Sequence, residues 1–302
     1  MLILLYAVVT LGYLGLAVWA WRCALAADTP NALLAVPAMS RVARGPGAFG
    51  PLERLALFAI WIAHLWLLGL DFRGPDGVRF GFASALSATM WVAIAVFWFE
   101  SIYFALSGMR LLILPIAGLC ALLPWWFPGT SSLAAADATR NPAFDAHVVV
   151  ALLSYSLLTI AALHALLMAA LDRWLHQSEV ATVSKRGLWA RIEGAILGQL
   201  PPLMTMEQLL FRLVAFGFAL LTLTVLTGIV FSEALFGRPL TLDHKTVFTL
   251  ISWLIFAALL FGRRLYGWRG RVALRWTLSG FVAMFLAYAG SRFVLEVVLH
   301  RV

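Results

Sequence analysis

Long runs of hydrophobic residues, separated by short polar segments, dominate this sequence. Windows of about 20 apolar residues are long enough to cross a hydrocarbon core of roughly 30 Å. Eight such windows occur, at about residues 2–21, 54–70, 86–106, 110–126, 147–171, 207–231, 245–262 and 272–296. The pattern predicts an all-α fold, a polytopic integral membrane helix bundle with about eight transmembrane helices that forms one domain over residues 1–302.

The composition agrees with a chain embedded in lipid. Of the 302 residues, 63% are hydrophobic and 12% are charged, and the mean hydropathy is +0.94. A soluble domain of this size cannot bury so much apolar surface, so we expect the lipid bilayer to be the chain's main partner. The net charge of +8 does not indicate a nucleic-acid partner, because the basic residues lie in short loops and are not interleaved with aromatic residues.

The N-terminal stretch and the two cysteines exclude some simple classes. The first 21 residues lack a basic start and are followed by Arg22, so they predict a retained transmembrane helix and not a cleaved signal peptide. Cys23 and Cys120 form no C-x-x-C or C-x-x-C-H motif, which argues against a thiol oxidoreductase and against covalent haem attachment. The predicted topology places the two thiols near opposite membrane faces, so we expect no disulfide.

The loop charges predict the orientation of the bundle. Fifteen basic residues belong to one side: Arg22, Arg41, Arg44, Arg54, Arg110, Arg173, Lys185, Arg186, Arg191, Arg212, Arg263, Arg264, Arg269, Arg271 and Arg275. Seven belong to the other: Arg73, Arg79, Arg140, Arg238, Lys245, Arg292 and Arg301. Because cytoplasmic loops carry the excess of Lys and Arg, both termini are expected to be exported.

The longest predicted cytoplasmic loops are residues 23–53 and 172–206. The second contains "GLWARIEGAILGQL", in which apolar residues recur at helical spacing. This segment is expected either to lie on the inner membrane surface or to serve as a simple connector.

Histidines gather on the exported side of the predicted bundle. Four of the six histidines lie there: His147 starts the fifth span in "FDAHVVVALLSY", His244 starts the seventh, His300 follows the eighth, and His64 lies about two turns inside the second. Neutral imidazole is the usual axial ligand of haem iron. The cluster is therefore compatible with a cofactor cavity, while each histidine alone is also typical of a hydrogen-bonding residue at a membrane interface.

Other polar residues within the spans are costly in lipid and so carry information. Glu100 and His164 lie at similar depth near the inner side, so Glu100 is expected to pair with either His164 or Arg110. Arg292 is followed one turn later by Glu296, which indicates either a pair within one helix or a contact of Arg292 with an anionic group such as a propionate. Small and hydroxyl residues on the His147 face of the fifth span, and Thr224, Thr227 and Gly228 in the sixth, indicate tight helix packing or a cavity wall.

Several long stretches carry a resemblance to a known family. They are "HVVVALLSYSLLTIAALHALLMA", "LPPLMTMEQLLFRLVAFGFALLTLTVLTG", "HKTVFTLISWLIFAALL" and "GWRGRVALRWTLSGFVAMFLAYAGSRFV". Over about residues 60–300 the chain resembles the cytochrome c assembly superfamily of CcsA/CcmC-type haem handlers, and more closely its YpjD/HemX-like branch. The resemblance implies an exported haem held by two external histidines that flank a tryptophan-rich loop.

His147 matches the first of these histidines, and His300 is close to the place of the second. The loop itself, W-G-x-x-W-x-W-D-x-K in the family, is degenerate here. It reads "FGRPLTLDHKT", with Phe236, Leu240 and Leu242 in place of the tryptophans, while Gly237, Asp243 and Lys245 remain. Leucine lacks the broad aromatic face on which a porphyrin plane rests. His244, beside Asp243, is an additional histidine that either replaces a ligand or caps the seventh span, and Phe261 stands where some members carry a histidine within the membrane.

Two functions therefore remain open. The first is a bacterial inner-membrane protein that binds haem b non-covalently and cooperates with cytochrome c maturation proteins, with His147, His300, His244, His64, Asp243 and Arg292 as candidate site residues. The second is a non-haem scaffold that regulates haem synthesis through a soluble enzyme bound at residues 172–206. A small-solute transporter is a more distant reading. No catalytic motif occurs, so we expect binding and transfer without enzymatic turnover.

Overall fold

The fold is a bundle of long helices. The computed structural model describes residues 2–27, 50–74, 77–78, 81–103, 107–129, 142–178, 197, 200–236 and 244–287. Within this part of the chain the helices are α1 (Leu2–Ala27), α4 (Pro51–Asp71), α5 (Phe82–Tyr103), α6 (Ser107–Trp126), α8 (Pro142–Ser178), α10 (Leu203–Phe236), α11 (His244–Tyr266) and α12 (Gly270–Phe285). A two-residue antiparallel pair, β1 (Arg73–Gly74) with β2 (Gly77–Val78), follows α4.

The prediction of a polytopic helical membrane protein is confirmed. Seven of these helices are long and apolar enough to cross a membrane, and they coincide with the first seven predicted spans. The described part of α12 ends at Phe285, and the rest of the predicted eighth span, beyond residue 287, lies outside the described residues. Helices α8 and α10 are longer than predicted, at 37 and 34 residues. Hydropathy detects only the apolar middle of a helix, whereas the backbone hydrogen-bond pattern continues into the polar flanks.

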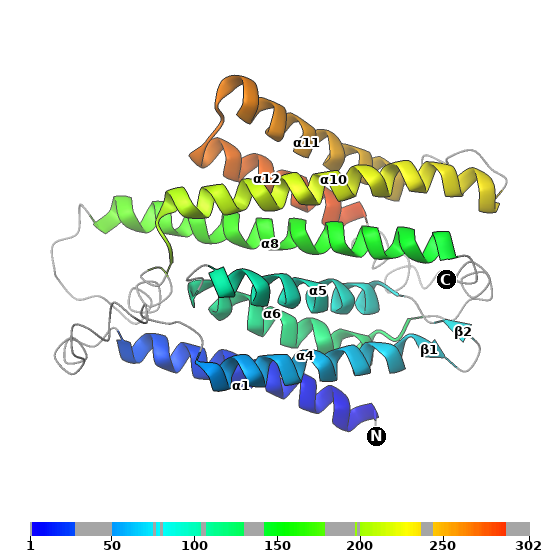
Figure 1. Ribbon diagram of the computed structural model, residues 1–302, viewed down its shortest axis with the longest axis horizontal. Coiled ribbons are helices and arrows are strands. Elements are labelled where there is room, and N and C mark those ends of the chain that lie inside the picture. Colours follow the sequence, from blue (N-terminus) through cyan, green and yellow to red (C-terminus); the bar gives the residue numbers. More distant parts are fainter. Residues whose placement is uncertain are drawn as a thin grey trace.

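The helices form two groups that pack side by side (Figure 1). We call α1, α4, α5 and α6 the N-terminal group, and α8, α10, α11 and α12 the C-terminal group. Contacts of α8 with α5 and with α6 join the two groups. Ser156 Oγ lies across the first of these contacts and donates a hydrogen bond to the backbone carbonyl of Thr89 at 3.0 Å.

Close packing within the C-terminal group depends on glycines at helix contacts. A Cβ atom at Gly217 of α10 would lie 2.8 Å from the side chain of Leu158 on α8, and one at Gly280 of α12 would lie 2.8 Å from the Phe256 ring on α11. The α11–α12 turn uses Gly267 and Gly270, whose φ angles of 66° and 53° are unfavourable for other residues. These glycines bring α8, α10, α11 and α12 into direct contact.

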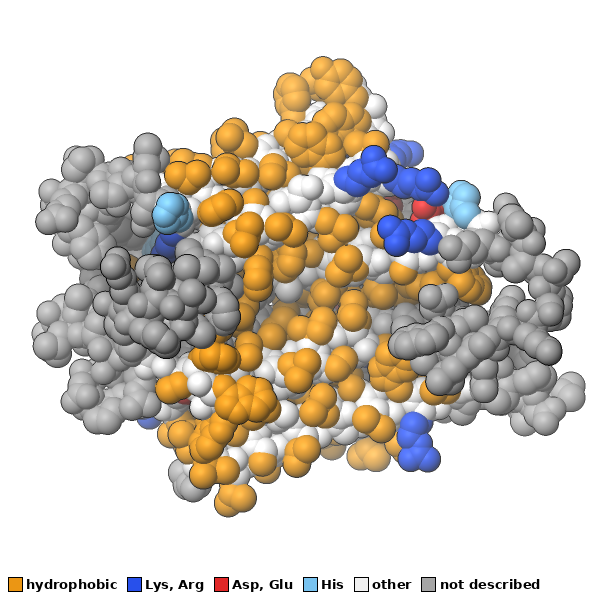
Figure 2. Space-filling view, turned by 180° about the vertical axis from the view of Figure 1, so that it is seen from behind, with side chains coloured by type: hydrophobic (Ala, Val, Ile, Leu, Met, Phe, Trp, Pro, Cys, Tyr) orange, Lys and Arg blue, Asp and Glu red, His pale blue; other side chains and the backbone are white. Residues whose placement is uncertain are grey.

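The surface of the bundle is apolar along its middle and charged at its ends (Figure 2). Leu4, Trp66, Phe216 and Phe261 are among the large hydrophobic side chains that stay more than 60% exposed. We call the end at which α4, α6, α10 and α12 begin the basic end, and the opposite end, at which α1, α8 and α11 begin, the histidine end. Ten described Lys and Arg residues belong to the basic end (Arg22, Arg54, Arg110, Arg173, Arg212, Arg263, Arg264, Arg269, Arg271 and Arg275) and two, Arg73 and Lys245, to the histidine end.

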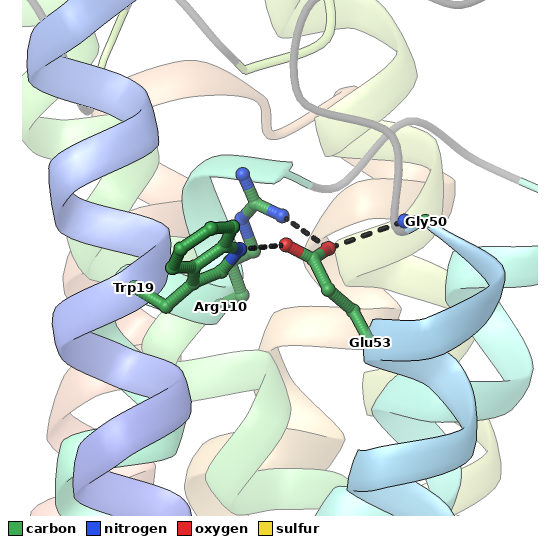
Figure 3. Close-up of polar contacts among 4 residues, drawn as sticks. All are labelled: Trp19, Gly50, Glu53 and Arg110. Carbon is green, nitrogen blue, oxygen red and sulfur yellow. Dashed lines mark hydrogen bonds and ion pairs between the residues drawn. The ribbon is translucent and has the colours of Figure 1, made fainter.

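Ion pairs hold the helices together at the basic end. Glu53 of α4 accepts hydrogen bonds from Trp19 Nε1 of α1 at 2.6 Å, from Arg110 Nη1 of α6 at 3.3 Å and from the Gly50 backbone N–H at 3.2 Å (Figure 3). The third bond also caps the start of α4, which the sequence marks with Pro51 in the first turn. In the C-terminal group, Glu207 pairs with Arg263 and Arg269, and Asp172 pairs with Arg271.

Candidate functional site

His147 lies in the second turn of α8, half-buried at the histidine end and facing α10. Its Nδ1 atom is 2.7 Å from Thr227 Oγ1. Gly228 follows Thr227, and a Cβ atom there would lie 3.5 Å from His147 Cε1, so the ring rests directly against the α10 backbone. The contact joins two residues 80 positions apart, and it fixes the orientation of the imidazole.

The Thr227 hydroxyl is also within hydrogen-bond distance of carbonyl oxygens of its own helix, 2.7 Å away at Leu223 and 3.2 Å away at Thr224. When its hydrogen is donated to Leu223, its oxygen can accept from His147, which corresponds to the neutral tautomer with the proton on Nδ1 and the lone pair on Nε2. This tautomer is the one in which histidine ligates metals, with its second nitrogen held by a hydrogen bond.

Helix α11 supplies polar groups beside His147. The ammonium group of Lys245 is close enough to His147 for the two side chains to interact electrostatically. Tyr155, about two turns after His147 on α8, forms a side-chain hydrogen bond with Thr249, which lies one turn after Lys245 on α11. The site therefore combines an oriented imidazole with a nearby cation at the junction of α8, α10 and α11.

The small and hydroxyl residues on the His147 face of the fifth predicted span take part in helix packing. Ser154 is fully buried and donates to the Gly217 carbonyl of α10 at 2.9 Å. Thr159 donates within α8 to the Tyr155 carbonyl at 2.7 Å. Of the two interpretations of this stripe, the described contacts support tight packing of α8 on α10.

The other predicted exported site residues have different settings. His244 is the first residue of α11 and is exposed to solvent. Asp243, Arg292 and His300 lie outside the described residues, as do Leu240 and Leu242 of the degenerate loop. The structure thus brings Lys245 beside His147, and the partnership of His147 with His300 or His244 stays a prediction.

His64 belongs to the N-terminal group and is completely buried. Its Nδ1 is 3.3 Å from the Tyr13 hydroxyl of α1, and its Nε2 is 2.9 Å from Ser87 Oγ of α5. Both ring nitrogens are therefore held by hydroxyl groups of neighbouring helices. These contacts hold His64 within the N-terminal group, whereas the hydrogen bond of His147 lies within the C-terminal group.

The expected pairing of Glu100 is not found. Among the described residues no hydrogen bond or ion pair joins Glu100 to His164 or to Arg110, and Arg110 pairs with Glu53 of α4. His164 Nδ1 is 3.1 Å from the Ile160 carbonyl of its own helix. Sequence position did not predict the partners of these groups, because the partner depends on which helix faces them.

A further group of buried polar residues lies in the N-terminal group. Tyr6, Asp71 and Ser84 form a buried hydrogen-bonded group near the histidine end that the sequence analysis did not identify. The sequence feature that could have indicated this group is the seven-residue spacing shared by Tyr6 with Tyr13 and by His64 with Asp71.

Both cysteines are free, and the described residues contain no group of three or more His, Cys, Asp or Glu side chains arranged to hold a metal ion.

Comparison with known proteins identifies the family. The model of the family described as "Cytochrome C assembly protein" matches residues 49–299. The chain belongs to this family. The match covers the C-terminal group and α4, α5 and α6 of the N-terminal group, which confirms the resemblance to the cytochrome c assembly superfamily.

Individual relatives of the chain support this family membership. It is 34% identical over 158 residues to the inner membrane protein YpjD of Escherichia coli K12, a match that covers 52% of this chain and 54% of the relative. It is 35% identical over 92 residues to the cytochrome c biogenesis protein CcsA of Gloeobacter violaceus, covering 30% of this chain and 27% of the relative. An uncharacterized protein of Azospirillum brasilense is 28% identical over 252 residues, which is 78% of this chain and 87% of the relative. The chain spans about half the length of the YpjD relatives that it matches.

Proposed function

We propose that this cytochrome c assembly protein binds haem b non-covalently in the bacterial cytoplasmic (inner) membrane, with His147 as an axial ligand. The observation that carries the proposal is the 2.7 Å contact of His147 Nδ1 with Thr227 Oγ1, which fixes the orientation of the ring and leaves coordination of the iron to Nε2. The protein would hold haem and pass it on, with no turnover chemistry of its own. Ligation and burial would control the iron's redox state.

The residues present fit a haem group in part. A neutral imidazole with a fixed tautomer is the donor that haem iron prefers, and the cation of Lys245 beside it suits a propionate carboxylate. The tryptophan platform is replaced by Phe236, Leu240 and Leu242, so the porphyrin plane would rest on a smaller aromatic surface. The second ligand would come from His300 or His244, with Asp243 and Arg292 as further polar groups of the site and His64 as a candidate deeper in the bundle.

The charge asymmetry of the bundle supports an exported site. Ten of the described basic residues belong to the basic end and two to the histidine end, which by the positive-inside rule puts the basic end in the cytoplasm. Both termini and His147 would then face the exported side, where cytochrome c maturation takes place. Maturation proteins on that side are the expected partners.

A second function is favoured by the loss of the tryptophans. The chain would then be a non-haem scaffold that regulates haem synthesis, and residues 172–206 at the basic end would bind a soluble enzyme of that process. Replacing residues 179–196 with a flexible linker of equal length tests this alternative. The regulator hypothesis predicts a changed cellular haem level with unchanged haem binding, and an unaltered haem level would contradict it.

The haem content of the purified full chain tests the proposed function. The chain is expressed with haem precursor supplied, purified in detergent and assayed for haem per polypeptide, beside the variants His147→Ala and His176→Ala. His176 is the matched control, because it is an exposed histidine at the opposite end of the same helix. We expect near-stoichiometric haem in the parent and in His176→Ala, and loss in His147→Ala. A parent chain without haem, or a His147→Ala variant that retains it, contradicts the proposal.

A further inference from the structure

Two buried hydrogen-bonded groups lie one below the other between α1, α4 and α5. In the outer group, Asp71 accepts from the Tyr6 hydroxyl at 3.0 Å and from Ser84 Oγ at 2.8 Å. In the inner group, His64 lies between the Tyr13 hydroxyl and Ser87 Oγ. Seven residues separate corresponding members on α1 and on α4, so the inner group lies roughly 10 Å deeper in the bundle.

Thr10 occupies the interval between these two groups. It lies one turn after Tyr6 and just under one turn before Tyr13, on the same face of α1. Thr10 is 6% exposed, and its Oγ1 atom has no hydrogen-bond partner among the residues that the structure describes. The antiparallel pairing of α1 with α4 sets it opposite Leu67 and Leu68, which offer no polar side chain.

The hydroxyl of Thr10 behaves unlike other threonine hydroxyls in the bundle. Six described threonines donate to the carbonyl four residues earlier in their own helix: Thr159, Thr222, Thr224, Thr227, Thr249 and Thr277. That bond satisfies a hydroxyl in an apolar environment at little cost. Thr10 does not make it, and a buried hydroxyl left without a partner is unfavourable. Among the described residues no protein group supplies the missing partner.

We infer that a water molecule binds at Thr10 and joins the two groups into one polar column, through which water from the Asp71 end of the bundle reaches His64. Buried water needs two to four polar partners. Thr10 Oγ1 would supply one, and the hydroxyls of Ser84 and Ser87, which already contact Asp71 and His64, would supply others, since the two serines are three residues apart and about 4.5 Å apart along α5. Asp71, at the end of α4 and 9% exposed, is the group through which the column meets the aqueous side.

The column is separate from the His147 site. It lies within the N-terminal group, whereas His147 and Thr227 belong to the C-terminal group. The inference therefore does not require haem binding at His147. It gives His64 a role as a hydrated polar centre inside the membrane-spanning part of the chain, able to exchange protons with water although its side chain has no exposed surface.

Water-edited solid-state NMR on the full chain, isotopically labelled and reconstituted in phosphatidylcholine vesicles, tests the inference. The experiment measures how quickly polarisation from water reaches the His64 imidazole compared with the Ile94 side chain, an apolar group of α5 that is equally buried. We expect signal build-up at His64 to be several times faster than at Ile94. Equal build-up at the two side chains in the parent chain overturns the inference, whatever any variant does.

Three variants locate the water. Thr10→Val keeps the shape of the side chain without the hydroxyl and is expected to slow the build-up at His64 towards that of Ile94. Thr10→Ser is expected to preserve the parent rate. Thr277→Val is the matched control, because Thr277 is a buried threonine that donates to its own helix, and it should leave His64 unchanged. An unchanged His64 build-up in Thr10→Val, with the Ile94 signal intact, would overturn the assignment of the water to Thr10.

Discussion

At the scale of single residues, the partner of each ring nitrogen distinguishes two histidines that look alike in the sequence. His147 Nδ1 contacts a hydroxyl that donates to a backbone carbonyl of its own helix, which favours the tautomer with the proton on Nδ1. His64 contacts a hydroxyl at each nitrogen. The first arrangement favours metal ligation through Nε2, and the second favours a hydrogen-bonded column. Spacing along the chain predicts neither, because Thr227, Tyr13 and Ser87 come from other helices.

Thr227→Val tests the orientation of His147. Valine has the shape of threonine but accepts no hydrogen bond, so Nδ1 loses its partner and the ring loses its fixed tautomer. Loss of such a supporting contact typically costs about 10–100-fold in metal affinity, and we expect a loss of this size in haem affinity measured by titration. Thr227→Ser should bind as the parent does. Thr159→Val, which alters a hydroxyl bonded only within α8, is the control, and equal affinity of Thr227→Val and the parent would refute the role of Thr227.

At the scale of helices, the sequence predicted where helices occur better than where they end or which helices they contact. Apolar windows located seven helices, while the ends of α8 and α10 extend past the windows because helical hydrogen bonding does not stop where the lipid does. The contacts between helices were less predictable. Arg110 was an expected partner of Glu100, yet it pairs with Glu53, because α4 and α6 meet at the basic end beside α1.

The close contact of α8 with α10 gives a prediction about stability. A methyl group at Gly217 would lie 2.8 Å from Leu158, so Gly217→Ala must push the two helices apart near the Ser154 hydrogen bond. We expect a loss of about 1–3 kcal/mol in the free energy of unfolding, measured by denaturant titration in detergent. Gly15→Ala is the matched control, because nothing lies within 4 Å of a Cβ atom there. Similar stability of the two variants would show that the α8–α10 contact is looser than described.

Glu53 of α4 contacts Trp19 of α1 and Arg110 of α6, and so joins three helices. The strength of the Glu53–Arg110 ion pair can be measured by a double-mutant cycle. Arg110 is only 3% exposed, so Glu53→Gln leaves a buried guanidinium facing a neutral amide. We expect a loss of about 1.5–3 kcal/mol in unfolding free energy, which is the range for hydrogen bonds to charged groups. Arg110→Met in the Glu53→Gln background should recover part of it. Strictly additive effects of the two substitutions would mean that the pair is not coupled.

At the scale of the whole molecule, charge and apolar surface together describe how the bundle lies in a membrane. The hydrophobic band between the charged ends matches the sequence expectation of lipid as solvent (Figure 2). Ion pairs concentrate at the basic end, where Glu53, Glu207 and Asp172 each neutralise an arginine. The number of basic residues in each predicted loop was enough to predict which end of the bundle carries most of them. The sequence did not predict which acidic residues pair with them.

The proposed orientation can be measured with the native cysteine of α1. Cys23 is exposed near the basic end, so in a Cys120→Ala background a membrane-impermeant maleimide should fail to label it in intact spheroplasts and should label it in inverted vesicles. A cysteine placed at the opposite end by His244→Cys should show the reverse pattern in a chain that lacks both native thiols. Labelling of Cys23 in intact spheroplasts would require the opposite topology and would put His147 in the cytoplasm.

The claim that His147 ligates haem is tested most directly by chemical rescue. Visible spectra of the detergent-purified His147→Gly variant are recorded in oxidised and reduced form, without and with added imidazole. We expect the parent's low-spin haem b spectrum to be lost in the variant and restored by imidazole, because a free imidazole can occupy the space of the missing ring and coordinate the iron. A parent spectrum that survives in His147→Gly, or a parent that takes up no haem when it is supplied, would contradict the role of His147.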